Sequence, residues 1–205
     1  METVKAVILD LFGAGTETSA TTIEWAMSEL LRNPTTMKKA QSEVRELLKE
    51  AHKNTEAAPT CSSSSPKTVP RACRIFNYDI AEGMTVLINV WAIGRDPKYW
   101  EDPEEFKPER FMNSGIDFKG NDFEFLPFGS GRRMCAGVSL GLANTALALA
   151  SLLYHFDWKL LDGLKSDEID MSESSGLATR RKTPLLLYAV PRKTNIGIHG
   201  LGSAS

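Results

Sequence analysis

The sequence is poor in cysteine, in net charge and in long apolar runs. Its 205 residues contain only three cysteines, Cys61, Cys73 and Cys135. An odd and sparse set of this kind excludes a disulfide framework and fits a reducing compartment. The three histidines do not cluster with the cysteines, so a zinc site built from both residue types is not expected.

Charge and hydropathy set further limits. The 24 lysine and arginine residues nearly balance the 26 aspartate and glutamate residues, which leaves a net charge of -2 at pH 7. This balance does not indicate nucleic acid or an anionic membrane surface as a partner. The apolar stretch 6–12 is too short to cross a bilayer and contains Asp10, and the N-terminal residues lack the pattern of a signal peptide. Hydrophobic residues make up 42% of the chain, enough for one medium domain with a core.

Apolar periodicity predicts three main helices. In residues 2–32, apolar side chains recur at helical spacing, and Asn33-Pro34 ends the helix because proline disfavours a helical residue before it. A second, charged helix is expected from Pro34 to about residue 52. Residues 139–153 are rich in alanine and leucine, so we expect a third helix that is buried. Short strands are expected at 74–80, 84–90, 156–160 and 185–190.

Two connecting segments differ sharply in composition. Residues 53–72 have no apolar periodicity and include four consecutive serines, so we expect a loop or disorder there. Residues 91–112 are rich in aromatic residues, proline and charge, which predicts an ordered coil. Together these elements predict a mainly α fold with small β elements.

The strongest functional pattern is Phe-Gly-Ser-Gly-Arg-Arg-Met-Cys-Ala-Gly, which begins at Phe128 and precedes the third helix. A metal-binding thiol must be deprotonated, and a helix N-terminus with nearby arginines favours a negatively charged Cys135 sulfur. Gly131 and Gly137 allow a flat cofactor to approach the backbone closely. Phe128 can cover one side of such a ring, and Arg133 can reach a carboxylate on it. The alternative is a glycine turn with a buried cysteine that binds nothing.

This pattern resembles the haem-binding loop of the cytochrome P-450 family, Phe-x-x-Gly-x-Arg-x-Cys-x-Gly. All the fixed positions match, at Phe128, Gly131, Arg133, Cys135 and Gly137. The resemblance implies that these residues bind heme (iron protoporphyrin IX) and that the Cys135 thiolate is the axial ligand to the iron. It also implies that Arg133 holds a haem propionate.

A second pattern lies within the first predicted helix, at residues 14–19. Small Ala14 and Gly15 let a flat ligand press against the helix backbone, and the acid–alcohol pair Glu17-Thr18 can carry protons. The pattern resembles the family's oxygen-activation helix, (Ala/Gly)-Gly-x-(Asp/Glu)-Thr-(Thr/Ser). This implies that Glu17 and Thr18 are catalytic and deliver the protons that split iron-bound dioxygen. The alternative is a polar stripe that faces solvent. A dinucleotide fingerprint is excluded, because the flanks are helical and Thr18 replaces its third glycine.

The resemblance extends to Pro-Glu-Arg-Phe at residues 108–111. In the family, Arg110 there completes a buried Glu-Arg-Arg network behind the haem. Residues 170–185 resemble the family's last substrate-contacting loop, whose tip near 175–177 would point into the substrate pocket. The sequence is similar in style to plant microsomal members. The resemblance therefore implies one incomplete domain over residues 1–205, the C-terminal part of the cytochrome P-450 fold.

Three parts of that domain are distinguished: the oxygen-activation helix at 2–32, an anomalous loop at 53–72, and the haem-binding loop with its following helix at 125–153. The anomalous loop stands where the family has a Glu-x-x-Arg helix, and that motif is absent. The glutamates in this interval, none followed by arginine at the required spacing, are Glu43, Glu46, Glu50 and Glu56. We expect Arg110 to lose its buried carboxylate partner, at a cost of about 3–5 kcal/mol.

The genetic code suggests a hypothesis for the origin of the four serines at 62–65. Leucine codons of the form CTC give the serine codon TCC when they are read one base later. The run is therefore interpreted as a leucine run read out of frame, through a frame slip, a lesion or a mispredicted splice.

The resemblance implies a haem-dependent monooxygenase that inserts one atom of dioxygen into an apolar small molecule. An NADPH-dependent reductase would supply electrons, and the family works at the cytosolic face of the endoplasmic reticulum membrane. We expect no nucleic-acid partner, no membrane anchor in this chain, and a soluble or unstable polypeptide. The alternatives are an inactive truncated or pseudogene-derived fragment that is not catalytic, and a small haem-binding or sensor module.

Overall fold

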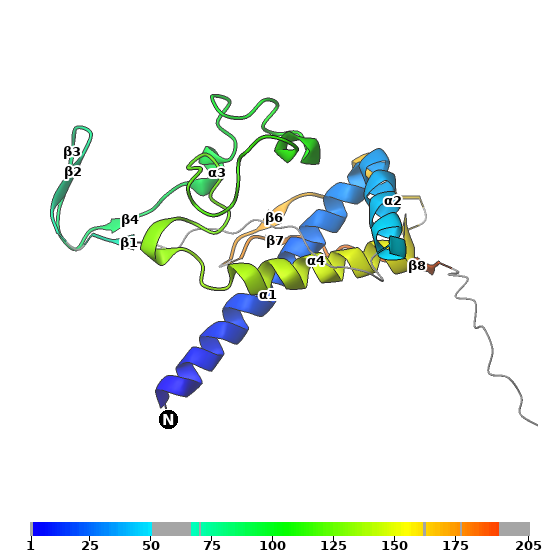
Figure 1. Cartoon of the computed structure of the whole chain (residues 1–205), viewed down its shortest axis with the longest axis horizontal. Coiled ribbons are helices and arrows are strands. Elements are labelled where there is room, and N and C mark those ends of the chain that lie inside the picture. The colour runs from blue at the N-terminus through cyan, green and yellow to red at the C-terminus, as the bar shows by residue number, and fades with distance from the viewer. Residues whose placement is uncertain (1, 51–66, 70, 162, 177, 193–205) are drawn as a thin grey trace, which may run out of the picture.

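Long helices and short antiparallel strands make up the described part of the chain (Figure 1). The computed structural model describes residues 2–50, 67–69, 71–161, 163–176 and 178–192. The long helices are α1 (Glu2–Arg32), α2 (Pro34–Glu50) and α4 (Val138–His155), and α3 (Val90–Ile93) is about one turn. The expected mainly α fold with small β elements is therefore confirmed.

A single residue, Asn33, separates α1 from α2. Its side-chain Nδ2 donates to the Glu29 carbonyl (2.9 Å), and its own carbonyl accepts from the Met37 N–H (2.9 Å). Pro34 occupies the first position of α2, where a helix does not use the N–H that proline lacks. The predicted helix end at Asn33-Pro34 is confirmed, and α2 is described as far as Glu50.

The strands pair in two-stranded antiparallel ladders. The pairs are β1 (Lys67–Thr68) with β4 (Thr85–Val86), β2 (Cys73–Ile75) with β3 (Tyr78–Ile80), β5 (Phe156–Leu160) with β8 (Leu187–Pro191), and β6 (Glu173–Ser174) with β7 (Arg180–Arg181). Strand β5 follows α4 directly, and its pairing with β8 returns the chain to the end of that helix. The predicted strand at 156–160 is confirmed, and the one at 185–190 begins two residues later than expected.

Two predicted strands take other forms. The segment 74–80 is a hairpin, because Phe76 has a positive φ of 52° and turns the chain between β2 and β3. The segment 84–90 is a strand only at β4. Its end begins α3 instead, because the Asn89 side chain accepts from the Ala92 N–H (2.9 Å) and caps that helix.

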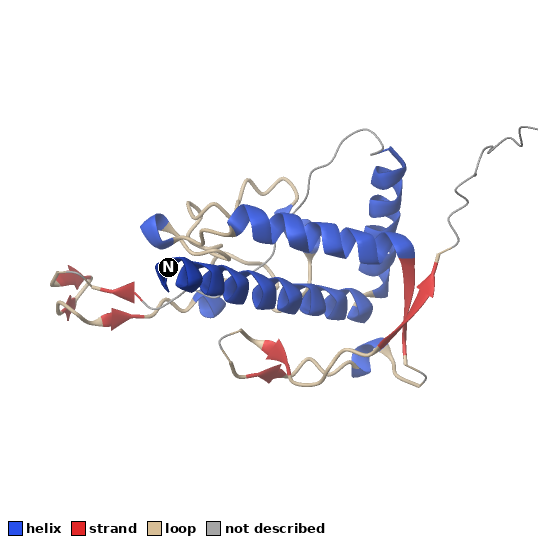
Figure 2. Cartoon of the chain, turned by 90° about the horizontal axis from the view of Figure 1, so that it is seen from below, coloured by secondary structure: helices blue, strands red, loops and turns tan. Residues whose placement is uncertain are grey.

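The core lies where the C-terminal half of α1 meets α2, the end of α4 and the β5–β8 ladder (Figure 2). Its buried side chains are Met27, Leu30, Leu31, Met37, Leu153 and Ile169. Each one stabilises the fold by about 1.5–3 kcal/mol relative to an exposed side chain. Because they come from separate parts of the chain, their burial fixes the helices relative to the ladder.

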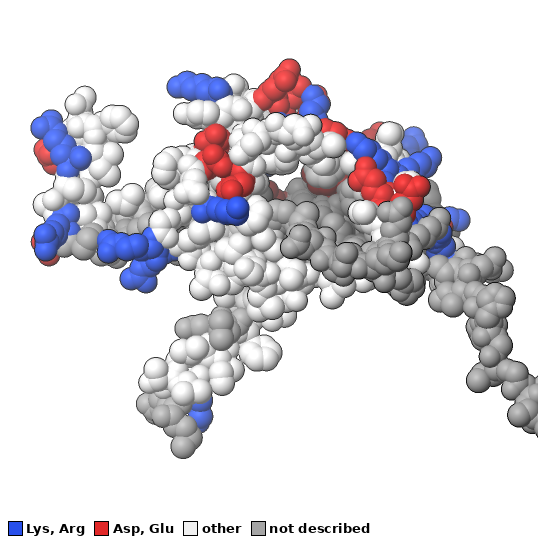
Figure 3. All heavy atoms as spheres, in the orientation of Figure 1, with Lys and Arg blue, Asp and Glu red and all other residues white. Residues whose placement is uncertain are grey.

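The N-terminal half of α1 extends away from this core (Figure 1). Its apolar side chains at Val4, Val7, Ile8, Leu9 and Phe12 are each at least half exposed. In the space-filling view, uncharged side chains make up most of the visible described surface of this half of the helix (Figure 3). Only the C-terminal half of α1 is therefore stabilised by the core.

Helix α4 is less buried than its composition predicts. Its buried positions are limited to Leu142, Thr145 and Leu153, whereas Leu140 and Leu147 are more than half exposed. The expectation of a buried third helix is wrong, because α1 and α2 pack against part of α4 and leave apolar residues open elsewhere. By length and composition α4 would also suit a membrane span, which is weak evidence for one, and α1 and α2 pack against it.

Aromatic packing orders the connection that follows α3. Trp100 is buried, and its ring lies edge-on to Phe111 (centroids 5.8 Å apart) and to Phe125 (6.0 Å). The ordered coil predicted at 91–112 is therefore confirmed. Most of the predicted loop at 53–72 lies outside the described residues, although strand β1 shows that its end is not all loop.

Candidate functional site

The cysteine loop connects a short 3-10 helix to α4. After that 3-10 helix (Gly131–Arg133), the Cys135 N–H donates to the Phe128 carbonyl (2.9 Å) and closes the loop. Gly137 caps α4, and its carbonyl accepts from the Gly141 N–H (2.8 Å). Cys135 therefore lies within one turn of a helix N-terminus, where the helix dipole favours a negatively charged sulfur.

Two side chains of this loop are open to binding. Cys135 is exposed and forms no disulfide, so the burial that the alternative expects is not observed. Arg133 is exposed and has neither a hydrogen bond nor an ion pair to any residue that the structure describes. A free thiol and an unpaired guanidinium thus stand two residues apart.

Contacts from residues 118–120 stabilise the cysteine loop, and no sequence motif pointed to them. The Ser130 hydroxyl donates to the Gly120 carbonyl (2.6 Å). Gly120 has a φ of +83°, and a Cβ there would lie 2.9 Å from the Gly129 carbonyl oxygen. The Phe118 ring lies edge-on to that of Phe128 (centroids 6.0 Å apart). In the sequence Gly120 is only a glycine in a polar loop, so no local signal indicates this contact.

The acid–alcohol motif lies in the middle of α1. The Thr18 hydroxyl donates to the Ala14 carbonyl (2.6 Å), and the Ser19 hydroxyl donates to the Gly15 carbonyl (2.8 Å). Both hydroxyls are therefore oriented by the helix backbone one turn back. Thr18 is exposed, and a Cβ on Gly15 would meet no atom within 4 Å. The helix surface is thus open at the small residues of the motif.

Glu17 is bound by the β6–β7 hairpin. Its Oε1 accepts from Arg180 Nη2 (2.7 Å) and from Arg180 Nε (2.9 Å). This hairpin carries the segment 175–177, which the resemblance implies is the tip of a substrate-contacting loop; Leu177 lies outside the described residues. The acid of the motif and the predicted substrate loop are therefore joined by one ion pair.

Helix packing places the two motifs on neighbouring elements. Helices α1 and α4 pack against each other, so the helix that carries Glu17 and Thr18 lies beside the helix that follows the cysteine loop (Figure 2). No hydrogen bond joins either residue to Cys135 in the described part of the chain. A ligand would have to bridge the two motifs.

The donor set fits a haem better than a metal held by protein ligands alone. Among the described residues, no three His, Cys, Asp or Glu side chains gather as a metal-holding group. Cys61, His52 and His199 lie outside those residues. Cys135 would therefore supply a single soft sulfur ligand, which suits an iron whose remaining ligands come from a porphyrin.

Arg110 is paired differently from the expectation. Its guanidinium is half-buried and donates to the carbonyls of Glu101 (2.7 Å), Asp102 (2.9 Å) and Glu105 (2.8 Å). No ion pair joins Arg110 to a carboxylate among the described residues, as expected, but the preceding turn supplies backbone acceptors in its place. Lys107 pairs with Asp102 and Glu105 from the same turn, and the Lys107 ammonium lowers the pKa of Asp102.

The chain also matches a known family over most of its length. A family model described as Cytochrome P450 matches residues 1–60 and 57–188. The two matched stretches meet inside the anomalous segment 53–72, so the break in the match and the break in composition coincide.

Named relatives and solved structures agree with this match. Zealexin A1 synthase of Zea mays is 50% identical, over 91% of this chain and 41% of the relative. The 5-epiaristolochene 1,3-dihydroxylase of Nicotiana tabacum is 49% identical, over 93% and 41%. A zebra fish cytochrome P450 solved with abiraterone superposes with a TM-score of 0.74 at 26% identity, over 90% of this chain and 47% of that one. The chain spans about two fifths of these relatives' length, and it belongs to the cytochrome P450 family.

Proposed function

We propose that this chain is the haem-binding part of a haem-dependent monooxygenase. The observation that carries the proposal is the exposed, free Cys135 at the start of α4, in a loop closed by its own N–H. Phe128, Gly131 and Gly137 would let a flat ring approach the loop. Arg133, which has no partner within the described residues, would hold a propionate.

A haem held by a thiolate supplies the cleavage of dioxygen and the transfer of one oxygen atom to a substrate. The chain's own residues would manage the protons. The Thr18 hydroxyl gives its hydrogen to the Ala14 carbonyl, so its oxygen keeps lone pairs free to accept another hydrogen bond. Both bonds from Arg180 end on Oε1 of Glu17, which leaves Oε2 as the oxygen that would take up and return a proton.

The relatives' names support oxygenation of a small molecule. They include Dolabradiene monooxygenase of Zea mays and Premnaspirodiene oxygenase of Hyoscyamus muticus, whose names describe oxygenation. For the whole protein we therefore infer an apolar small-molecule substrate, electrons from an NADPH-dependent reductase, and a place at the cytosolic face of the endoplasmic reticulum membrane.

One observation favours a second candidate, an inactive fragment. The Glu-x-x-Arg motif is absent between α2 and β2, where residues 53–72 depart from ordinary composition. Such a chain would keep the cysteine loop without completing an oxygenase. The hydrogen bonds from Arg110 to nearby backbone carbonyls argue against this second candidate, because they order the surrounding coil without the Glu-x-x-Arg motif.

The experiment is to express the chain with added haem and record the absorption spectrum of the reduced, carbon-monoxide-bound form. If Cys135 ligates the iron, the Soret band shifts to the red position typical of thiolate ligation, and Cys135→Ala abolishes that shift. Cys73→Ala is the matched control, because Cys73 is also free and exposed but lies on β2. A spectrum without the shifted band, or one equally changed by both substitutions, would favour the inactive fragment.

A further inference from the structure

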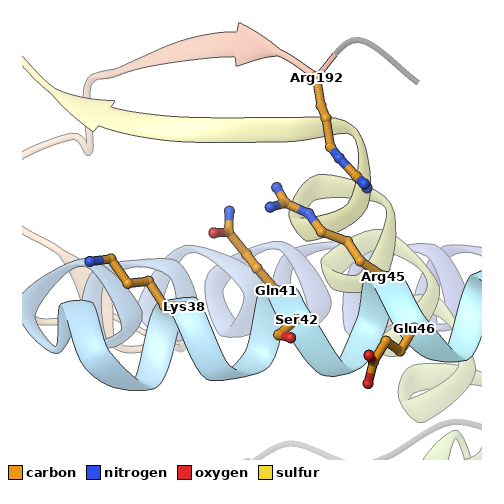
Figure 4. Close-up of a pocket in the computed structure, with 6 residues that line it drawn as sticks. All are labelled: Lys38, Gln41, Ser42, Arg45, Glu46 and Arg192. Atoms are coloured by element: carbon orange, nitrogen blue, oxygen red, sulfur yellow. The ribbon is translucent and has the colours of Figure 1, made fainter. Parts of the chain in front are cut away.

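A cavity outside the proposed haem site lies between α2 and the end of β8. It has a volume of about 290 Å³ and is lined by Lys38, Gln41, Ser42, Arg45, Glu46 and Arg192 (Figure 4). Arg45 belongs to α2 and Arg192 follows β8 directly, so the cavity forms where these two elements meet. Neither residue has a role in the proposed oxygenase chemistry.

The two arginines lie toward one another across this cavity (Figure 4). Arg45 is held in place, because its Nη2 donates to the Phe156 carbonyl (3.1 Å) and to Asp157 Oδ1 (2.7 Å). The Arg192 backbone N–H donates to the His155 carbonyl (2.8 Å), and the Arg192 guanidinium lies over the Tyr154 ring (5.7 Å to the centroid). Both guanidinium groups are therefore positioned at the cavity by contacts that do not depend on a ligand.

Each arginine keeps a buried N–H without an acceptor. Arg45 Nε and Arg192 Nη1 are both buried, and neither has a hydrogen-bond partner among the described residues. The carboxylate of Asp157 is used by Nη2 of Arg45, and the Glu46 carboxylate points away from both guanidinium groups (Figure 4). A buried N–H without an acceptor is unfavourable, and one bound oxyanion could accept from both of these donors.

We infer that this cavity binds a phosphate group. Guanidinium groups match the oxygens of phosphate, and two of them approaching from different elements suit an anion with several acceptor oxygens. Gln41 lies beside them, with its Nε2 bonded to the Phe156 carbonyl (3.1 Å), and it completes a polar wall. Lys38 points away from the arginines in Figure 4 and adds positive charge only at the rim.

The test measures phosphate binding to the full chain without haem, by calorimetry and by the shift of the unfolding midpoint with phosphate concentration. We expect a dissociation constant on the order of 1 mM for inorganic phosphate. Arg192→Gln should weaken binding at least about tenfold, since it removes a charge-assisted hydrogen bond. Arg74→Gln is the matched control and should leave binding unchanged, because Arg74 is an exposed arginine on β2 that pairs with Asp79.

A second variant and a second probe separate the remaining outcomes. Arg45→Lys keeps a charge on α2 but loses the planar fork, so it should also weaken binding. Vesicles that contain phosphatidic acid test a lipid source: binding to vesicles alone, lost in Arg192→Gln, would assign the site to a lipid headgroup. Absence of binding in both arms, or binding that neither arginine substitution weakens, would overturn the inference. Because no haem is present, the result is independent of the proposed oxygenase function.

Discussion

Arg181 of β7 donates from Nη1 to the hydroxyl of Ser28 in α1, at 2.9 Å, and both residues are buried. The same guanidinium lies over the Trp25 ring (5.5 Å to the centroid) and 3.8 Å from a carboxylate oxygen of Glu24. A buried cation therefore attaches the β6–β7 hairpin to the part of α1 that the core holds.

Removal of this buried cation should loosen the hairpin. We expect Arg181→Ala to lower the free energy of unfolding by about 2–3 kcal/mol, because a hydrogen bond to a charged group is lost in a buried place. Arg180→Ala is the matched control and should cost less than about 1 kcal/mol, because its ion pair with Glu17 is largely exposed. Urea unfolding followed by circular dichroism compares the two. Equal losses would contradict a special role for the buried residue.

The brace under the cysteine loop gives a second prediction. Gly120→Ala places a Cβ 2.9 Å from the Gly129 carbonyl oxygen and does so at a φ of +83°. We expect a loss of about 2–3 kcal/mol and weaker haem binding. Gly115→Ala has a similar φ of +74° but meets no atom within 4 Å, so it should cost only about 1 kcal/mol. Unfolding and haem titration of the two variants would show whether the close contact matters.

Stability in acid should depend on Asp170. The Thr183 hydroxyl (2.5 Å), followed by Ser172, lowers the pKa of Asp170 from its ordinary 3.8 to about 2. Because the folded pKa is the lower one, ionised Asp170 stabilises the fold above pH 4, and this contribution disappears as the pH falls from about 4 to about 2. Thr183→Val should flatten the pH dependence of unfolding in that window. Thr85→Val, at an exposed position without a carboxylate partner among the described residues, should leave it unchanged.

The anomalous segment makes a genetic prediction. If the serines at 62–65 are a leucine run read out of frame, the transcript read in the neighbouring frame across codons 45–73 should encode leucines and a Glu-x-x-Arg motif. Sequencing of the transcript checks this directly. If the neighbouring frame lacks that motif, the frame-slip hypothesis is wrong and the serine run belongs to the true sequence of the protein.

Local patterns predicted much of the fold. Asn33-Pro34 marks the boundary between α1 and α2, because proline acts on the residue beside it. The hairpin at 73–80 was missed, because its turn is made by Phe76, a residue type that rarely takes a positive φ. The exposure of α4 was also missed, because apolar composition does not tell how much of a helix its neighbours cover.

In the candidate site, too, local motifs were predictable from the sequence and long-range contacts were not. The residues from Phe128 to Cys135 follow one another, so their pattern is visible in the sequence. The brace at Gly120 and the bond from Arg180 to Glu17 join residues 10 and 163 positions apart, and neither forms a pattern. The acceptors of Arg110 are backbone carbonyls, which no side-chain motif can reveal.

Helix α1 is continuous, but tertiary packing stabilises its two halves to different extents. Its C-terminal half shares the core, whereas the described side chains before Glu17 are exposed, including several that are apolar. The ion pair between Arg180 and Glu17 lies close to the boundary between these two halves. Fraying from the N-terminus would therefore stop near Glu17, and backbone amides on its two sides should differ in hydrogen-exchange protection by orders of magnitude. The proposed proton-handling residues would then sit at the border between a rigid segment and one that opens readily.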